Sequence, residues 1–116
     1  MVAVYVGPAL LLVHQSYRIG WHLPGGGVRR GEMPEAAARR ELAEEIGVAV
    51  STLLPAGVAC GNWDGRRDRV HFFELRLVEW PKLQLDNREI TGVRFMLPCE
   101  LHDMAVTGPV AAYLGR

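Results

Sequence analysis

The stretch that decides the fold is Gly26–Val48, which reads GGVRRGEMPEAAARRELAEEIGV. It begins with a glycine-rich turn and continues into a run of strong helix formers. Pro34 suits the first helical turn, where its missing N–H would have had no partner. Gly47 is a natural residue to end a helix. The sequence therefore predicts a helix of about three to four turns that begins at Pro34 and ends before Gly47.

Three carboxylates gather on one side of this predicted helix. Each residue advances about 100° around a helix, so Glu41, Glu44 and Glu45 share an arc of roughly 100°. Like charges this close repel one another unless a cation lies over them. Oxygen ligands without histidine or cysteine favour Mg²⁺ or Mn²⁺ over Zn²⁺. The alternative is a solvated acidic face that Arg39 and Arg40 neutralise.

The spacing of the whole stretch resembles the signature box of the Nudix hydrolases, G-x5-E-x7-R-E-U-x-E-E-x-G-U, in which U is a bulky aliphatic residue. The fixed positions are filled by Gly26, Glu32, Arg40, Glu41, Leu42, Glu44, Glu45, Gly47 and Val48. Outside the box, Trp21–Gly25 looks like the family's lead-in. The segment Arg94–Pro98 is similar to the family's closing strand and short helix.

The resemblance implies an α/β fold, namely an α/β/α sandwich whose mixed β-sheet carries one long catalytic helix and short C-terminal helices. We expect residues 1–116 to form one such domain. The residue pattern predicts strands at Val2–Val6, Ala9–His14, Trp21–Leu23, Val48–Cys60, Arg67–Val78 and Thr91–Leu97. The first two could instead be one strand with a bulge, and Pro55 and Gly57 make Val48–Cys60 either an edge strand or a strand with a kink. It predicts loops at Gln15–Gly20, Gly61–Asp68 and Trp80–Asn87, and short helices at Pro98–Asp103 and Val110–Leu114.

The resemblance also implies a reaction, the hydrolysis of a pyrophosphate linkage in a nucleoside diphosphate derivative with Mg²⁺ or Mn²⁺. A metal would acidify a bound water, and a glutamate would take its proton. The region Gly61–Gly65 lacks the proline or tyrosine that often accompanies ADP-ribose or dinucleoside polyphosphate substrates, which favours a small nucleoside triphosphate or a promiscuous enzyme. Two alternatives are a non-catalytic nucleotide-sensing or scaffold domain and a purely structural domain. The intact box argues against both.

By resemblance, Glu41, Glu44 and Glu45 match the metal-binding and base-supplying glutamates of the family. Gly25 matches a position whose carbonyl can touch the metal. Glu89 precedes the last predicted strand, where many relatives carry a glutamate that reaches the metals or acts as base. For Glu89 the alternative is an ordinary surface residue.

The remaining candidate residues divide into two groups. The positions of the box with an expected structural role are Gly26, Glu32, Arg40 and Gly47, since Glu32 and Arg40 match a pair that holds the loop to the helix. The candidates for binding substrate are Tyr17, Trp21, Trp63 and Arg66. The aromatic rings would stack on a nucleobase, with packing as the alternative, and the arginine would bind phosphate, with an exposed turn as the alternative.

The composition limits the kinds of binding partner that the chain is expected to have. Thirteen basic and thirteen acidic residues balance, so no net field favours a nucleic-acid polymer or an anionic membrane. No apolar run reaches the roughly 18 residues of a membrane span, and the opening residues do not read as a signal peptide. Cys60 and Cys99 are expected to be reduced, buried thiols of a cytoplasmic protein. A second copy of the chain completing an edge strand would make a homodimer.

Overall fold

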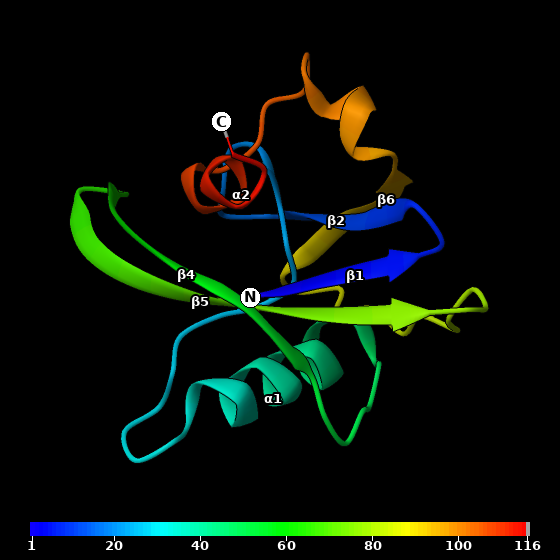
Figure 1. The fold of residues 1–116 in the computed structure, drawn as a ribbon, viewed down its shortest axis with the longest axis horizontal. Coiled ribbons are helices and arrows are strands. Elements are labelled where there is room, and N and C mark those ends of the chain that lie inside the picture. The colour runs from blue at the N-terminus through cyan, green and yellow to red at the C-terminus, as the bar shows by residue number, and fades with distance from the viewer. Residues whose placement is uncertain (116) are drawn as a thin grey trace.

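The computed structural model describes residues 1–115, so Arg116, the last residue of the expected domain, lies outside the described part. The elements in chain order are β1 (Val2–Val6), β2 (Ala9–Gln15), β3 (Trp21–His22), α1 (Pro34–Ile46), β4 (Leu54–Trp63), β5 (Arg66–Leu77), β6 (Ile90–Met96), the 3₁₀ helix η1 (Pro98–Leu101) and α2 (Gly108–Tyr113). Helix α1 covers one face of the sheet, and η1 and α2 lie on the other (Figure 1). The predicted sandwich is confirmed.

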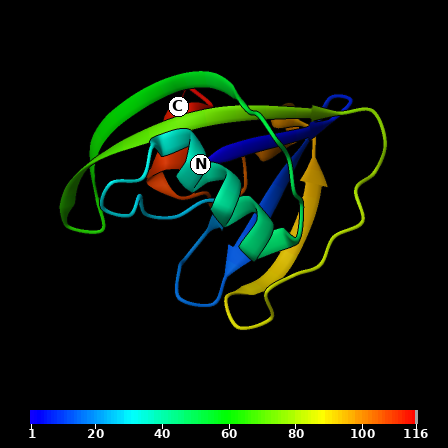
Figure 2. The ribbon, with the colours of Figure 1, turned by 90° about the horizontal axis from the view of Figure 1, so that it is seen from below.

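The sheet is mixed, as predicted. Its strand order is β3-β2-β1-β5-β4, and β6 pairs with β2 outside this path. Strands β1 and β5 run parallel, with Val4 opposite Leu75, whereas the other pairs are antiparallel. Alternate residues of β1 enter the two cores, since Val2 and Val4 pack with residues of α1 and Ala3 packs on the opposite side. Figure 2 shows helix α1 lying across its face of this sheet.

Helix α1 has the ends that its sequence predicts. It begins at Pro34, and Gly47 ends it in the left-handed conformation, with φ of 73° and its N–H donating to Ala43 O. Leu42 and Ile46 lie one helical turn apart, beside the three glutamates, and both are fully buried against the sheet. Among residues 1–115, no helix is long and apolar enough to cross a membrane.

The loop after β5 completes the C-terminal end of α1. Gln84 N donates to Ile46 O and Asp86 N donates to Glu45 O, both at 2.9 Å. The last turn of a helix leaves carbonyl groups without partners inside the helix, and these two bonds satisfy them. The predicted loop Trp80–Asn87 is therefore confirmed, and it leads the chain past the acidic end of the helix.

The hairpin of β4 and β5 has a shorter turn than the sequence predicts. Only Asp64 and Gly65 lie outside the strands, both with positive φ, 54° and 74°. Such a pair is the preferred two-residue connection of a hairpin because its twist matches that of the strands. The turn lies within the predicted segment Gly61–Asp68, but the predicted length was wrong. The other polar residues of that segment belong to the exposed ends of the two strands.

Two other boundaries differ from the prediction. Strand β4 begins at Leu54 rather than Val48, and its pairing with β5 shifts between Pro55 and Gly57, at the predicted kink. Gln15 belongs to β2 instead of the following loop and is fully buried. A polar residue suggested a loop there, but the strand continues because it pairs with β6 up to this position.

The two cysteines are free, as expected, but both are exposed rather than buried. Cys60 lies on β4, which forms the edge of the sheet, and Cys99 lies in the short helix η1. In the same two elements Ala59 and Leu101 pack in a core, whereas the cysteine positions face outward.

Strand β3 is tied to the segment that precedes α2. Trp21 N donates to Ala105 O and Thr107 N donates to Trp21 O. His22 is 1% exposed, and its Nδ1 lies 2.6 Å from Thr107 Oγ1. Burial lowers the pKa of His22 to about 3, so the imidazole is neutral in the folded protein at physiological pH.

This buried histidine predicts a loss of stability in mild acid. An unfolded histidine has a pKa of about 6.5, so the unfolded chain binds a proton first as the pH falls below that value, and the loss continues down to pH 3. At pH 5 the free energy of unfolding should be lower by about 2 kcal/mol from His22 alone. Urea unfolding at pH 7 and pH 5 measures this loss.

His22→Gln is the control because glutamine keeps a hydrogen-bonding side chain that does not titrate in this range. The fall in unfolding free energy from pH 7 to pH 5 should be smaller in this variant by about 2 kcal/mol. Equal falls in the two proteins would show that His22 is protonated in the folded state.

Candidate active site

The turn before α1 is held against the helix by Arg40. Its Nε and Nη2 each donate to the Glu32 carboxylate at 2.9 Å, and Nη2 also donates to Gly27 O at 3.0 Å. Arg29 N donates to the same carboxylate. These bonds, those from Arg40 above all, lower the pKa of Glu32 to about 2, so the pair is ionised. The box residues thereby connect the loop to the helix.

The next two acids of the helix also face Arg40. Its Nη1 donates to Glu41 Oε1 at 2.7 Å and lies 3.4 Å from Glu44 Oε2, on the exposed side of the helix. The backbone of Gly26 packs directly on the first of these carboxylates, since a Cβ at that position would lie 2.7 Å from Glu41 Cδ. Glycine is therefore needed for close contact between the turn and the acid.

Glu45 points the other way, into the protein, and is 2% exposed. Its Oε2 accepts a hydrogen bond from Gly25 N at 2.6 Å, and its Oε1 accepts one from Gln15 Nε2 at 2.9 Å. No Lys, Arg or His among residues 1–115 forms an ion pair with it. Burial raises the pKa of Glu45 to about 7, and the charges of Glu41 and Glu89 add to this rise against the two hydrogen bonds.

Glu89 reaches the same neighbourhood from the loop before β6. Its N–H donates to Asp86 O, and its carbonyl accepts a hydrogen bond from Ser16 N at 2.8 Å. Its negative charge acts on Glu45 and also on Tyr17, whose pKa is raised first by burial and then by Glu89. The sequence-predicted acids of the helix and the late loop thus form one electrostatic group.

The acidic group fits a hard divalent cation in its chemistry, although its side chains are turned elsewhere. Within residues 1–115, no three His, Cys, Asp or Glu side chains stand in an arrangement that would hold a metal ion. Glu41 and Glu44 contact Arg40, while Glu45 is buried and forms no ion pair within residues 1–115. The positive group that acts on Glu45 is the α-amino group of Met1, whose pKa burial lowers to about 6, so this group is mostly neutral at physiological pH. A cation would supply the missing counter-charge. The residues that would hold it are the carbonyl of Gly25 and the carboxylates of Glu41, Glu44 and Glu45, once Glu41 and Glu44 exchange Arg40 for the ion.

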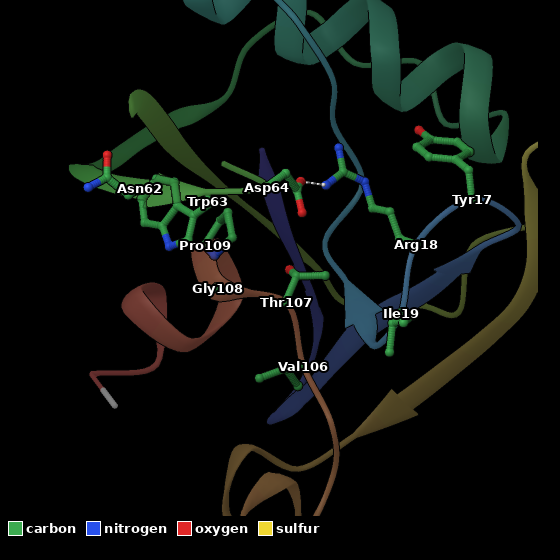
Figure 3. Close-up of a pocket in the computed structure, with 10 residues that line it drawn as sticks. All are labelled: Tyr17, Arg18, Ile19, Asn62, Trp63, Asp64, Val106, Thr107, Gly108 and Pro109. Atoms are coloured by element: carbon green, nitrogen blue, oxygen red, sulfur yellow. Dashed lines mark hydrogen bonds and ion pairs between the residues drawn. The ribbon is translucent and has the colours of Figure 1, made fainter. Parts of the chain in front are cut away.

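A cavity of about 570 Å³ lies between the tip of the β4–β5 hairpin, the segment after β2 and the start of α2 (Figure 3). It is lined by Tyr17, Arg18, Ile19, Asn62, Trp63, Asp64, Val106, Thr107, Gly108 and Pro109. Its volume lies within the range of about 300–1,000 Å³ that is usual for small-molecule sites. Three segments far apart in the sequence therefore build one concave surface.

Trp63 forms a flat wall of this cavity. A Cβ at Gly61 would lie 2.6 Å from the indole ring, and a Cβ at Gly108 would overlap it. The two glycines therefore let strand β4 and helix α2 approach the ring closely, and Figure 3 shows it beside Gly108 and Pro109. The ring is fixed by this packing while one side of it lines the cavity.

The opposite wall joins the cavity to the acidic group. Arg18 Nη1 donates to Asp64 Oδ2 at 3.1 Å, which connects the segment after β2 with the hairpin tip, as the dashed line in Figure 3 marks. Tyr17 lines the same wall, and its ring feels the charges of Glu89 and Glu45. Tyr17 is thus the lining residue that connects the cavity electrostatically with the acids, none of which lines the cavity itself.

The other two candidates for substrate binding do not line this cavity. The Trp21 ring packs edge-on against His14, with 5.5 Å between ring centroids, and lies under the Arg94 guanidinium. Arg66 begins β5 and is exposed at the hairpin. A role for either in substrate binding stays a prediction.

Sequence reasoning missed Gln15, which the structure places on the Glu45 carboxylate. A signal for it was available, because Leu11, Val13 and Gln15 alternate along β2 and share one face. It also missed Thr107 and Gly108, which only the folded chain brings to the cavity.

Comparison with known proteins shows the family to which the chain belongs. A family model described as NUDIX domain matches residues 1–113, and the chain belongs to this family. A MutT NUDIX hydrolase from Burkholderia pseudomallei has the same fold, with a TM-score of 0.85 over 98% of this chain and 92% of that chain. At 19% identity, this likeness concerns the fold alone.

Two curated relatives match parts of the chain. An RNA pyrophosphohydrolase of Bartonella clarridgeiae is 48% identical over 54 residues, 44% of this chain and 31% of the relative. Diphosphoinositol polyphosphate phosphohydrolase 3-alpha of Mus musculus is 39% identical over 70 residues, 60% of this chain and 42% of the relative. The matched segments span less than half the length of either relative.

The contact of Gly26 with Glu41 predicts that Gly26→Ala weakens cation binding without unfolding the protein. The new methyl group would push the carboxylate, which ends a flexible side chain, so unfolding free energy should change by no more than about 1 kcal/mol. The Mn²⁺ dissociation constant, measured by the paramagnetic resonance of free Mn²⁺, should rise about tenfold.

Gly27→Ala is the matched control, because a Cβ there meets no heavy atom within 4 Å. It should bind Mn²⁺ as the parent protein does. If the two alanine variants bound Mn²⁺ equally well, the packing of the turn on Glu41 would have no part in cation binding.

Proposed function

We propose that this chain catalyses the hydrolysis of a pyrophosphate linkage in a nucleoside diphosphate derivative with Mg²⁺ or Mn²⁺. A nucleoside triphosphate or a related small nucleotide is the favoured substrate, and a nucleoside monophosphate is one product. The observation that carries the proposal is Glu45, a buried carboxyl group that is held by two N–H donors beside Glu41 and Glu89 and forms no ion pair with a basic side chain among the described residues. The names of both curated relatives are those of phosphohydrolases.

The acids of α1 and the loop before β6 would share the chemistry. When bound, the cation would neutralise phosphate charge and acidify a water. Glu41, Glu44 and Glu45 would hold the cation, and one carboxylate of the group that these acids form with Glu89 would take the proton from the attacking water. The clamp of Arg40 on the turn keeps Gly25 beside Glu45 throughout.

The cavity next to the acids would hold the nucleoside. Stacking of a base on an aromatic ring contributes about 1–3 kcal/mol and tolerates any base. Trp63 offers such a ring, and Tyr17 lies between the cavity and the acids. This arrangement supports a ligand with a flat group at one end and phosphates at the other.

The remaining proposals concern the binding partners and the cellular location of the protein. The balanced charge supports a small nucleotide over a nucleic-acid polymer. Strand β4 ends the sheet and would be the edge to which a second copy adds in a homodimer. We propose a cytoplasmic location on the composition alone.

The proposed reaction is tested with a substrate panel in the presence of Mg²⁺ or Mn²⁺. The panel contains nucleoside triphosphates, ADP-ribose, dinucleoside polyphosphates, nucleotide sugars and an RNA with a 5′-triphosphate, the last because one relative is named for RNA. A nucleoside triphosphate should release a nucleoside monophosphate, and Glu45→Gln should lower kcat/KM by about 100-fold or more.

Glu79→Gln is the matched control, since this glutamate is exposed in the loop after β5. It should keep the parent rate. Nucleotide binding without turnover would favour the sensing or scaffold domain. Full activity in Glu45→Gln would show that Glu45 is not needed for the chemistry.

The cavity predicts a separate effect on substrate affinity. Trp63→Leu removes the stacking surface and keeps an apolar side chain, so KM for a nucleoside triphosphate should rise about tenfold while kcat stays within about twofold. Trp80→Leu is the control because Trp80 packs on Phe95 outside the cavity. Steady-state kinetics of both variants measure this, and an unchanged KM in Trp63→Leu would place the base elsewhere.

A further inference from the structure

Gln15 is a polar side chain at a position of the apolar core. Leu11 and Val13 precede it on the same face of β2 and pack with Leu42 and Ile46 of α1. Gln15 is 0% exposed. Burying an amide costs about 1–3 kcal/mol unless its polar atoms find partners, so a leucine or valine would be the simpler choice here.

The amide group holds the carboxylate of Glu45 from one side. Gln15 Nε2 donates to Glu45 Oε1 at 2.9 Å, and Gly25 N donates to Oε2 at 2.6 Å. Each carboxylate oxygen therefore receives one donor, and the two donors come from different elements. This arrangement fixes the plane of the carboxylate and leaves further lone pairs on both oxygens.

The other end of the amide is unsatisfied. Among residues 1–115, Gln15 Oε1 is buried and has no hydrogen-bond partner. When Glu45 is ionised, as it must be to bind a cation, turning the amide does not remedy this, because the amide oxygen would then face a carboxylate oxygen that has no proton to donate. The neighbouring N–H of Gly25 is already bound to the same carboxylate. A water beside Glu45 is the donor that suits this acceptor.

The end of β2 also joins the two elements that carry the acids. Ser16 N donates to Glu89 O at 2.8 Å, and Ser16 Oγ donates to Arg88 O at 3.3 Å. Gln15 contacts Glu45 of α1, and Ser16 contacts the loop that carries Glu89. A shift at Gln15 would consequently move both.

We propose that Gln15 is a positioning residue of the site: its Nε2 orients the Glu45 carboxylate toward the cation, and its Oε1 accepts a hydrogen bond from a water beside that carboxylate. This inference rests on the proposed metal-dependent hydrolysis. Gln15 would act through Glu45 and this water and would not contact the substrate.

The test is Gln15→Met, which keeps the length of the side chain and removes both polar atoms. The Mn²⁺ dissociation constant, measured without substrate by the paramagnetic resonance of free Mn²⁺, should rise by about 10- to 100-fold. With a nucleoside triphosphate, kcat should fall while KM stays within about twofold. Gln15→Asn, whose amide is too short to reach Glu45, should show the same losses and serves if the methionine variant does not fold.

His14→Gln is the matched control, because the side chain of His14 lies on the face of β2 opposite Gln15 and pairs with Thr91. It should leave the Mn²⁺ affinity and kcat unchanged. If the Gln15 variants altered only the melting temperature and kept both values, the inference would be overturned and the proposed function would stand. If the parent protein bound no Mn²⁺ and hydrolysed no nucleotide, both would fail.

Discussion

The buried charge of Glu45 is the constraint on which the rest of the site depends. An ionised carboxylate with 2% exposure is costly unless donors or a cation compensate for the lost water. The fold provides two donors, one from the glycine turn and one from the end of β2. No Lys, Arg or His among the described residues forms an ion pair with Glu45, and the Met1 α-amino group that acts on it is mostly neutral because burial lowers its pKa to about 6. Three elements must therefore meet at one carboxylate, and that meeting point sets the register of helix, turn and strand.

The acids of α1 differ in environment although they share one arc. Glu41 and Glu44 face Arg40, which binds the turn through Glu32, whereas Glu45 faces inward. Arg40 thus holds the turn through Glu32 and Gly27 and contacts Glu41 and Glu44 of the helix. In the proposed function, a cation would have to replace Arg40 at Glu41, so the clamp and the proposed cation site share acids of one helix.

Local chemistry explains which features the sequence predicts. Pro34 and Gly47 end the helix through their own backbone preferences, so both boundaries were predicted correctly. Gln15 was placed in a loop because its side chain is polar, although its alternation with Leu11 and Val13 along β2 puts it on the buried face. The cavity at Trp63 requires close approach to Gly108, and only the folded chain brings those residues together. The three acids of α1 are neighbours in the sequence, whereas the residues around the cavity come from three separate segments.

The central claim is that Glu45 is held as a carboxylate for a divalent cation. The anomalous scattering of Mn²⁺ in a crystal soaked with the ion tests it most directly. We predict a peak within bonding distance of the Glu45 carboxylate, with Glu41 turned from Arg40 toward the ion. A peak on the exposed Glu44 away from Glu45, or no peak at this face of α1, would contradict the claim.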